Sequence, residues 1–291
     1  MTFCTVQEVK DAINYPSDGS PIQDSVIEGF IKDSEDEIED IYKTKFGNIE
    51  QSGTADGDYA TTTLSDTSQT WTTDEYINYI VWIYGGTGSG QYSEIQSNTA
   101  TKLTFNAVTT APDNTSTYRI IKLGYKDETV TGSGMREQFV GYQPLINLNS
   151  LTIDSTSVTP SYVYQYNYSG KLELSSDAEY SYFSNATPQL VNITYIYGVY
   201  PLPRIIKRLC ICIAGVRTLT GQIAGTYDDF TSVTLPGGFT GSKGEPYTNI
   251  QASLNFLQGE ARGIVYGTQS TGQVSGDFRT QPSFRPYTIF G

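Results

Sequence analysis

The side chains that could support catalysis or metal binding are few in this sequence and form no familiar pattern. No histidine occurs among the 291 residues. This removes the commonest general base and metal ligand. Cys210 and Cys212 are two residues apart on a segment with helical periodicity, so their thiols point to different sides and cannot easily hold one metal ion. We interpret both as small buried hydrophobic residues.

The acidic run at 33–40, Asp-Ser-Glu-Asp-Glu-Ile-Glu-Asp, is the densest group of possible cation ligands. It falls inside a predicted helix, where Ile38 and Ile41 interrupt it at the spacing of core residues. It lacks the glycine-bearing pattern of a calcium loop. We interpret the run as a solvated helix face, with a cation site as the alternative.

Other signatures of chemistry are absent from the sequence. The glycine cluster at 85–90 lacks the Lys-Ser/Thr pair and the following helix of a phosphate-binding loop, and it predicts a hairpin turn. No nucleophile elbow, zinc-ligand spacing or dinucleotide fingerprint occurs. We therefore expect a protein that is not an enzyme and that has no catalytic residues, cofactor or metal.

The composition is acidic, polar and rich in tyrosine. The formal net charge is −13, charged residues make up 17%, and there are 23 tyrosines. Abundant Gly, Ser, Thr, Asn and Tyr favour β-structure with many turns. No basic stripe for nucleic-acid binding occurs, and the acidity suits solubility or repulsion of a passing polyanion such as DNA. We expect no signal peptide and no membrane-spanning segment.

Helical periodicity places one strongly apolar helix at 203–222, which organises the rest of the chain. Pro203 suits its first turn. Residues at three- and four-residue steps predict a shared face, and further apolar residues make 209–216 apolar nearly all round. Such a helix is either central to a core or packed between subunits. The predicted face comprises Ile205, Leu209, Cys212, Ile213, Val216 and Leu219. Three further helices are predicted at 5–14, 24–46 and 246–263. Thr5 and Glu8 have the spacing of a capping box at the start of the first of these.

Two stretches between these helices predict β-structure with different patterns. Residues 48–122 alternate aromatic-rich strands with turns and predict a small all-β module. Residues 123–200 predict strands at 148–154, 162–166, 171–174 and 191–197, and a strand pair around the Gly-Ser-Gly turn at 132–134. The end of the chain, 274–291, is Pro-broken and aromatic and has too few apolar residues to fold alone. Such a segment is either disordered or ordered by a partner, and its aromatic and arginine content favours a partner.

The order of these parts resembles the head–tail adaptor (connector) family of tailed double-stranded DNA bacteriophages. The resemblance rests on 4–13 followed by 22–39, on Gly132-Ser-Gly-Met-Arg-Glu-Gln-Phe-Val-Gly-Tyr-Gln-Pro-Leu-Ile146, on Leu151-Thr-Ile-Asp154, and on Val191-Asn-Ile-Thr-Tyr-Ile-Tyr-Gly198 leading through Pro203 into the apolar helix. It covers roughly 1–47 and 124–222. Residues 48–122 depart from a minimal adaptor and are similar to β-modules of virion proteins.

The resemblance implies a mechanical role rather than a chemical one. Members of the family form a ring, typically of about twelve copies, below the portal protein. The ring extends the DNA channel and joins the capsid to a downstream neck or tail-completion protein. It implies location in the virion neck at the head–tail interface, synthesis in the host cytoplasm, DNA passing without sequence-specific binding, and no membrane.

Together these observations predict an α+β protein with a small helical adaptor core, two β-rich portions and an extended C-terminal arm. The expected domains are an adaptor core from 1–47 and 124–222, an inserted all-β module at 48–123, and a linker, short helix and arm at 223–291. The candidate assembly interface consists of Arg204, Lys207, Arg208, Phe278, Arg279, Phe284, Arg285, Tyr287 and Phe290.

A second hypothesis is a carbohydrate- or surface-binding β-module of a tail fibre or baseplate. It rests on Trp71, Tyr76, Tyr79 and Trp82, whose rings could stack on sugars. The structural alternative is that these aromatic side chains fill the core of the small module at 48–122.

Overall fold

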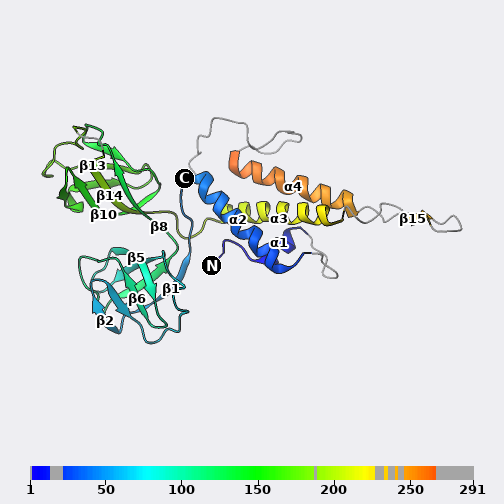
Figure 1. Ribbon diagram of the computed structural model, residues 1–291, viewed down its shortest axis with the longest axis horizontal. Coiled ribbons are helices and arrows are strands. Elements are labelled where there is room, and N and C mark those ends of the chain that lie inside the picture. The colour runs from blue at the N-terminus through cyan, green and yellow to red at the C-terminus, as the bar shows by residue number, and fades with distance from the viewer. Residues whose placement is uncertain are drawn as a thin grey trace. The chain divides into compact units, whose positions relative to one another are not determined.

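A computed structural model describes residues 2–13, 22–186, 189–226, 233–234, 240–241 and 246–266. The fold is mixed α and β, as expected for the α+β class. The chain separates into two compact units. We call 43–202 the β unit, and 2–42 together with the segment from Pro203 onward the helical unit; Figure 1 shows the elements of each.

The helical unit is built from both ends of the described chain. Its helices are α1 (Val6–Ala12), α2 (Asp24–Tyr42), α3 (Arg204–Thr226) and α4 (Pro246–Tyr266), and a short strand pair, β15 (Val233–Thr234) with β16 (Thr240–Gly241), lies between α3 and α4 in sequence. α1 begins with the predicted capping box, because the Thr5 hydroxyl accepts from the Glu8 N–H and the Glu8 carboxylate from the Thr5 N–H. α2 ends at Tyr42, four residues before the predicted end, because Lys43 adopts a left-handed φ of 50°.

The first part of the β unit is a small barrel. Its seven strands pair in the order β1-β7-β4-β5-β6-β3-β2. β1 and β2 are consecutive in the chain but stand at opposite ends of this order. The N–H of Ala55 donates to the Ser116 carbonyl and that of Asp56 to the Ser65 carbonyl, so pairing continues from one end to the other and closes the sheet. The strands are β1 (Ile49–Thr54), β2 (Gly57–Ala60), β3 (Thr63–Ser65), β4 (Ile80–Gly85), β5 (Gln91–Asn98), β6 (Lys102–Phe105) and β7 (Thr117–Ile121).

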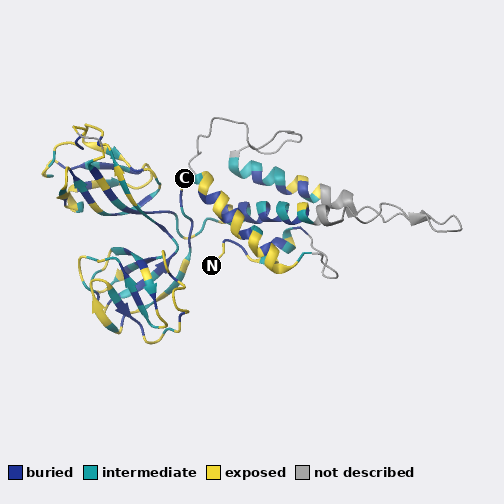
Figure 2. Cartoon of the chain, viewed as in Figure 1, coloured by how far each residue is buried: buried dark blue, intermediate teal, exposed yellow. Residues whose placement is uncertain are grey.

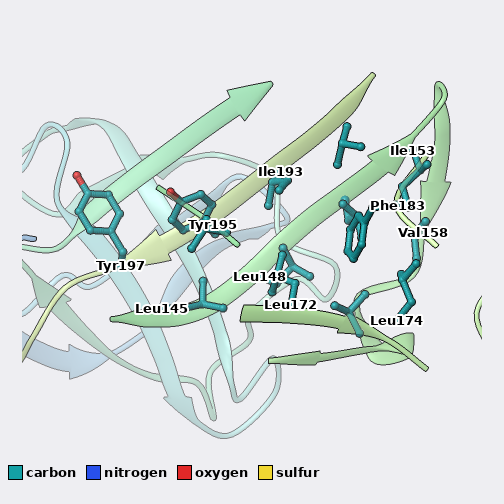
Figure 3. Close-up of a cluster of buried hydrophobic side chains, with 14 residues drawn as sticks. Leu145, Leu148, Ile153, Val158, Leu172, Leu174, Phe183, Ile193, Tyr195 and Tyr197 are labelled. Atoms are coloured by element: carbon teal, nitrogen blue, oxygen red, sulfur yellow. The ribbon is translucent and has the colours of Figure 1, made fainter. Parts of the chain in front are cut away.

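The second part of the β unit is a pair of sheets around one core. A four-stranded sheet has the order β11-β10-β14-β8, and a three-stranded sheet has the order β12-β13-β9. Their inward side chains share a cluster that includes Leu148, Leu172 and Tyr195 (Figure 3). The elements are β8 (Gly124–Val130), β9 (Glu137–Phe139), β10 (Leu145–Ile153), β11 (Thr156–Val158), a 3-10 turn (Pro160–Tyr162), β12 (Val163–Tyr166), β13 (Lys171–Leu174) and β14 (Val191–Tyr197).

Several predictions about strands are confirmed and one is wrong. The glycine cluster at 85–90 forms the turn between β4 and β5, which pair with each other. β14 lies at the predicted 191–197. The strands on either side of 132–134 do not pair with each other, because β8 pairs with β14 and β9 pairs with β13. The Gly-Ser-Gly segment therefore carries the chain from one sheet to the other.

The domain grouping differs from the expected one. Residues 124–202 belong with the barrel in the β unit, whereas the helices of both chain ends belong together. A cluster of Ile80, Ile121, Leu123 and Ile196 connects the barrel with β14 inside the β unit. The β unit as a whole thus occupies the sequence between α2 and α3.

A buried carboxylate holds the barrel core together. The Tyr118 hydroxyl, buried beside Trp71, donates to Asp66 at 2.7 Å, and Asp66 also accepts from Ser68 and Gln69. Burial alone would raise the pKa of Asp66, but these hydrogen bonds outweigh it and lower that pKa. The carboxylate is therefore stabilised in its ionised form.

We predict that Tyr118→Phe weakens the barrel in a pH-dependent way. Because the folded pKa of Asp66 is lowered, its hydrogen bonds stabilise the fold above about pH 4, and this contribution is lost as the pH falls through the folded pKa. The substitution should lower the free energy of unfolding at pH 7 by about 1.5–3 kcal/mol, and by less at acid pH. Urea unfolding followed by tryptophan fluorescence measures both. Tyr59→Phe, at an exposed position, is the control; an equal loss for Tyr118→Phe at both pH values contradicts the assignment.

Candidate assembly surfaces

The apolar helix α3 lies at the centre of the helical unit. It contacts α1, α2 and α4, and Figure 2 shows most of its described length as buried or intermediate. A Cβ at Gly215 would lie 3.0 Å from both Ile13 and Leu257, so α3 is approached closely from two sides. The predicted all-round burial is confirmed for much of the helix. Its fully buried apolar side chains are Ile206, Leu209, Cys210, Cys212 and Ala214.

The predicted apolar face is wrong at one residue. Ile205 is 40% exposed in the first turn of α3. Its neighbour Ile206 is buried instead, so the start of the buried face is shifted by one residue. Ile205 therefore presents apolar surface beside the exposed Arg204.

Two basic side chains at the start of α3 pair within the chain. Lys207 Nζ lies 2.6 Å from Glu8 of α1, and this contact lowers the pKa of Glu8. Arg208 makes a bidentate pair with Glu260 of α4, at 2.6 and 2.7 Å. The pairing raises the pKa of Arg208 and lowers that of Glu260. These contacts tie α1 and α4 to α3. A role for Arg204, Lys207 and Arg208 between subunits stays a prediction.

The acidic run of α2 is met by a different arginine. Arg217 Nη2 lies 2.8 Å from Glu37, and Nη1 donates to Ser34 at 3.1 Å. The solvated-face interpretation holds for Asp33, Asp36, Glu37 and Asp40, which are exposed, but is wrong for Glu35 and Glu39, which are buried. Glu35 accepts from the Phe3 N–H and so anchors the start of the described chain. The described residues contain no group of side chains suited to a metal ion.

The cysteines are buried, as predicted for Cys210 and Cys212. The Cys210 thiol lies 3.6 Å from that of Cys4, a neighbour that the sequence did not suggest. The contact with Cys4 and burial raise the pKa of Cys210, and burial raises that of Cys212 to about 12. Such thiols stay protonated and unreactive at neutral pH.

The aromatic residues suggested for sugar stacking mostly fill the barrel. Trp71 and Tyr76 are buried and meet edge to face, with ring centroids 6.0 Å apart. Tyr79 is partly buried against the same cluster, and Trp82 stacks on Tyr92. The structural alternative is therefore confirmed for Trp71, Tyr76 and Tyr79. It is wrong for Trp82, which packs on the separate cluster of Ile80, Ile121, Leu123 and Ile196.

An exposed group of aromatic residues lies elsewhere, on the three-stranded sheet. Tyr164, Tyr166 and Phe139 point away from the core that Val163 and Leu172 enter. The signal that could have revealed it is the strict alternation of tyrosine at 162, 164, 166 and 168. The sequence predicted a strand here but not its exposed face.

The remaining predicted interface residues lie outside the described part of the chain. They are Phe278, Arg279, Phe284, Arg285, Tyr287 and Phe290. Among the described helices, none is both long enough and apolar enough to cross a membrane. A scan of known protein families and a search of curated proteins find no match for this chain.

We predict that the Arg208–Glu260 pair contributes more to the helical unit than the Lys207–Glu8 pair. Bidentate geometry and partial burial favour the first pair, whereas exposed pairs contribute little. Double-mutant cycles with alanine, measured by urea unfolding and helical circular dichroism, should give a coupling of about 0.5–1 kcal/mol for Arg208–Glu260 and less for Lys207–Glu8. No measurable coupling for Arg208 and Glu260 contradicts a tether between α3 and α4.

Proposed function

We propose that this chain is a structural virion protein, a head–tail adaptor that forms a ring below the portal of a tailed bacteriophage. In this role it extends the DNA channel and joins the capsid to the neck or tail. The proposal includes no catalysis and no cofactor.

The observation that carries the proposal is the order of parts around α3. α1 and α2 come first, the β unit follows, and β14 ends at Tyr197-Gly198 before Pro203 opens α3. This is the order in which the sequence resembles the adaptor family. The helical unit supports a mechanical role, because its side-chain charges serve to pair helices.

The charge of the chain also supports a channel-lining role. The β unit holds fifteen Asp and Glu side chains against eight Lys and Arg. An acidic wall repels a passing polyanion and does not grip it. Sequence-specific DNA binding is not part of the proposal.

Co-expression with a portal protein tests the proposal. Native mass spectrometry of the purified complex should show a ring of many copies of this chain on the portal, as should negative-stain images. The proposal is overturned if the chain stays monomeric and does not bind the portal protein under any condition.

Deletion of 275–291 tests the part of the predicted interface that lies in the arm. We expect the truncated protein to keep its circular dichroism spectrum and cooperative thermal unfolding, because the described core ends before this segment. Assembly with a neighbour, measured by the same native mass spectrometry, should weaken. If the deletion abolishes solubility or cooperative unfolding, the segment belongs to the core and the expectation is wrong.

A further inference from the structure

The outer face of the three-stranded sheet carries two rows of side chains that we call the tyrosine face. Strand register places Tyr166, Lys171 and Phe139 in one row and Tyr164, Glu173 and Glu137 in the next. Residues paired across antiparallel strands share one side of the sheet. The aromatic members are 45–59% exposed. The face therefore presents large rings to solvent.

The charged members of the tyrosine face hold the Tyr166 ring in place. The Tyr166 hydroxyl donates to Glu173 at 2.9 Å, and Lys171 Nζ lies 2.9 Å from Glu137 and 3.2 Å from Glu173. The ammonium group of Lys171 also sits 4.0 Å from the Tyr166 ring centroid. A preorganised aromatic surface loses little side-chain entropy when a partner binds.

Two further exposed tyrosines flank β12. Tyr162 ends the 3-10 turn before the strand, and Tyr168 lies in the turn after it. The four tyrosines lie within seven consecutive residues, 162–168. Exposed aromatic surface of this extent is typical of an interaction site, in which tyrosine is enriched.

We propose that the tyrosine face binds residues 275–291 of a second copy of this chain. This segment has the composition that the face would select. It contains two arginines against one aspartate, together with Phe278, Phe284, Tyr287 and Phe290. Its prolines at 282 and 286 favour an extended backbone that can lie along a strand.

Charge complementarity supports this choice of partner. The β unit is acidic, whereas 275–291 is one of the few basic segments of the chain. Tyrosine rings attract guanidinium groups, and the β unit already shows this contact, with Arg119 4.3 Å from the Tyr84 ring centroid. Arg279 and Arg285 are therefore the side chains that we assign to the tyrosine face.

The length of the segment allows contact with a neighbouring molecule. The chain continues for about 25 residues beyond α4, which could extend over at most about 80–90 Å. An arm of one copy bound to a face of the next is a heterologous contact, which builds rings when the rotation closes. The inference deepens the proposed function, since it names the contact that would link neighbours in the ring, but its test needs no portal.

A binding experiment tests the inference directly. A labelled peptide of 275–291 is titrated with the chain lacking 275–291, and fluorescence anisotropy reports binding. We expect saturable binding that weakens about tenfold or more with Tyr164→Ser/Tyr166→Ser. Tyr59→Ser removes an exposed tyrosine from the barrel and is the matched control, expected to leave binding unchanged. A peptide with Arg279→Ala/Arg285→Ala should also bind more weakly, and this change cannot unfold the protein.

A mixing experiment shows whether the contact joins two copies. The full-length Tyr164→Ser/Tyr166→Ser variant keeps the arm but lacks the face, and the truncated chain keeps the face but lacks the arm. Light scattering should show that the mixture forms one-to-one pairs and that neither variant alone associates.

Three outcomes overturn the inference. These are failure of the peptide to bind at millimolar concentration, equal binding of the peptide to the two-tyrosine variant and the parent, and a mixture that stays monomeric. If the peptide does not bind, the full chain is tested on a glycan array. Glycan binding that is lost with Tyr164→Ser/Tyr166→Ser would show that the tyrosine face binds a carbohydrate and not the arm. If the tyrosine face binds the arm but the chain does not bind the portal protein, the result counts against the proposed function and leaves this inference standing.

Discussion

The burial of α3 is the constraint on which the other features of the helical unit depend. A helix that is apolar nearly all round has to be covered on several sides, because each exposed Leu or Ile side chain forgoes about 1.5–3 kcal/mol. The cover comes from α1 and α2 before the β unit and from α4 after α3. Both ends of the described chain must therefore meet around α3. The pairs Lys207–Glu8, Arg208–Glu260 and Arg217–Glu37 then fix each covering helix in place.

The β unit contains hydrophobic cores of its own. It occupies the sequence between α2 and α3, with one core inside the barrel and one between two sheets. The aromatic residues of the barrel core, such as Trp71 and Tyr118, are buried, whereas Phe139, Tyr164 and Tyr166 of the three-stranded sheet are exposed on one face. The exposed group is available for assembly, which is the role we propose for the protein.

Local patterns in the sequence predicted the elements well and their partners less well. The capping box at Thr5, the turn at 85–90 and the strand at 191–197 follow from short-range chemistry, and all three are confirmed. The pairing of β8 with β14 joins residues about 65 positions apart, which no local signal specifies. The burial of Glu35 and the approach of Cys4 to Cys210 likewise depend on tertiary contacts. The tyrosine face was visible as an alternation, but only the sheet shows which side is exposed.

The central claim is that the apolar surface of α3 is satisfied within one molecule rather than between subunits. Hydrogen exchange of the full chain, at a concentration where it is monomeric, tests this claim most directly. The account predicts that the amides of α3 between Leu209 and Leu219 exchange more slowly than those of any other helix in the described chain, without any partner. Fast exchange of the α3 amides in the monomer, with protection only after assembly, would contradict this claim. It would show that a neighbouring subunit buries the apolar surface of α3.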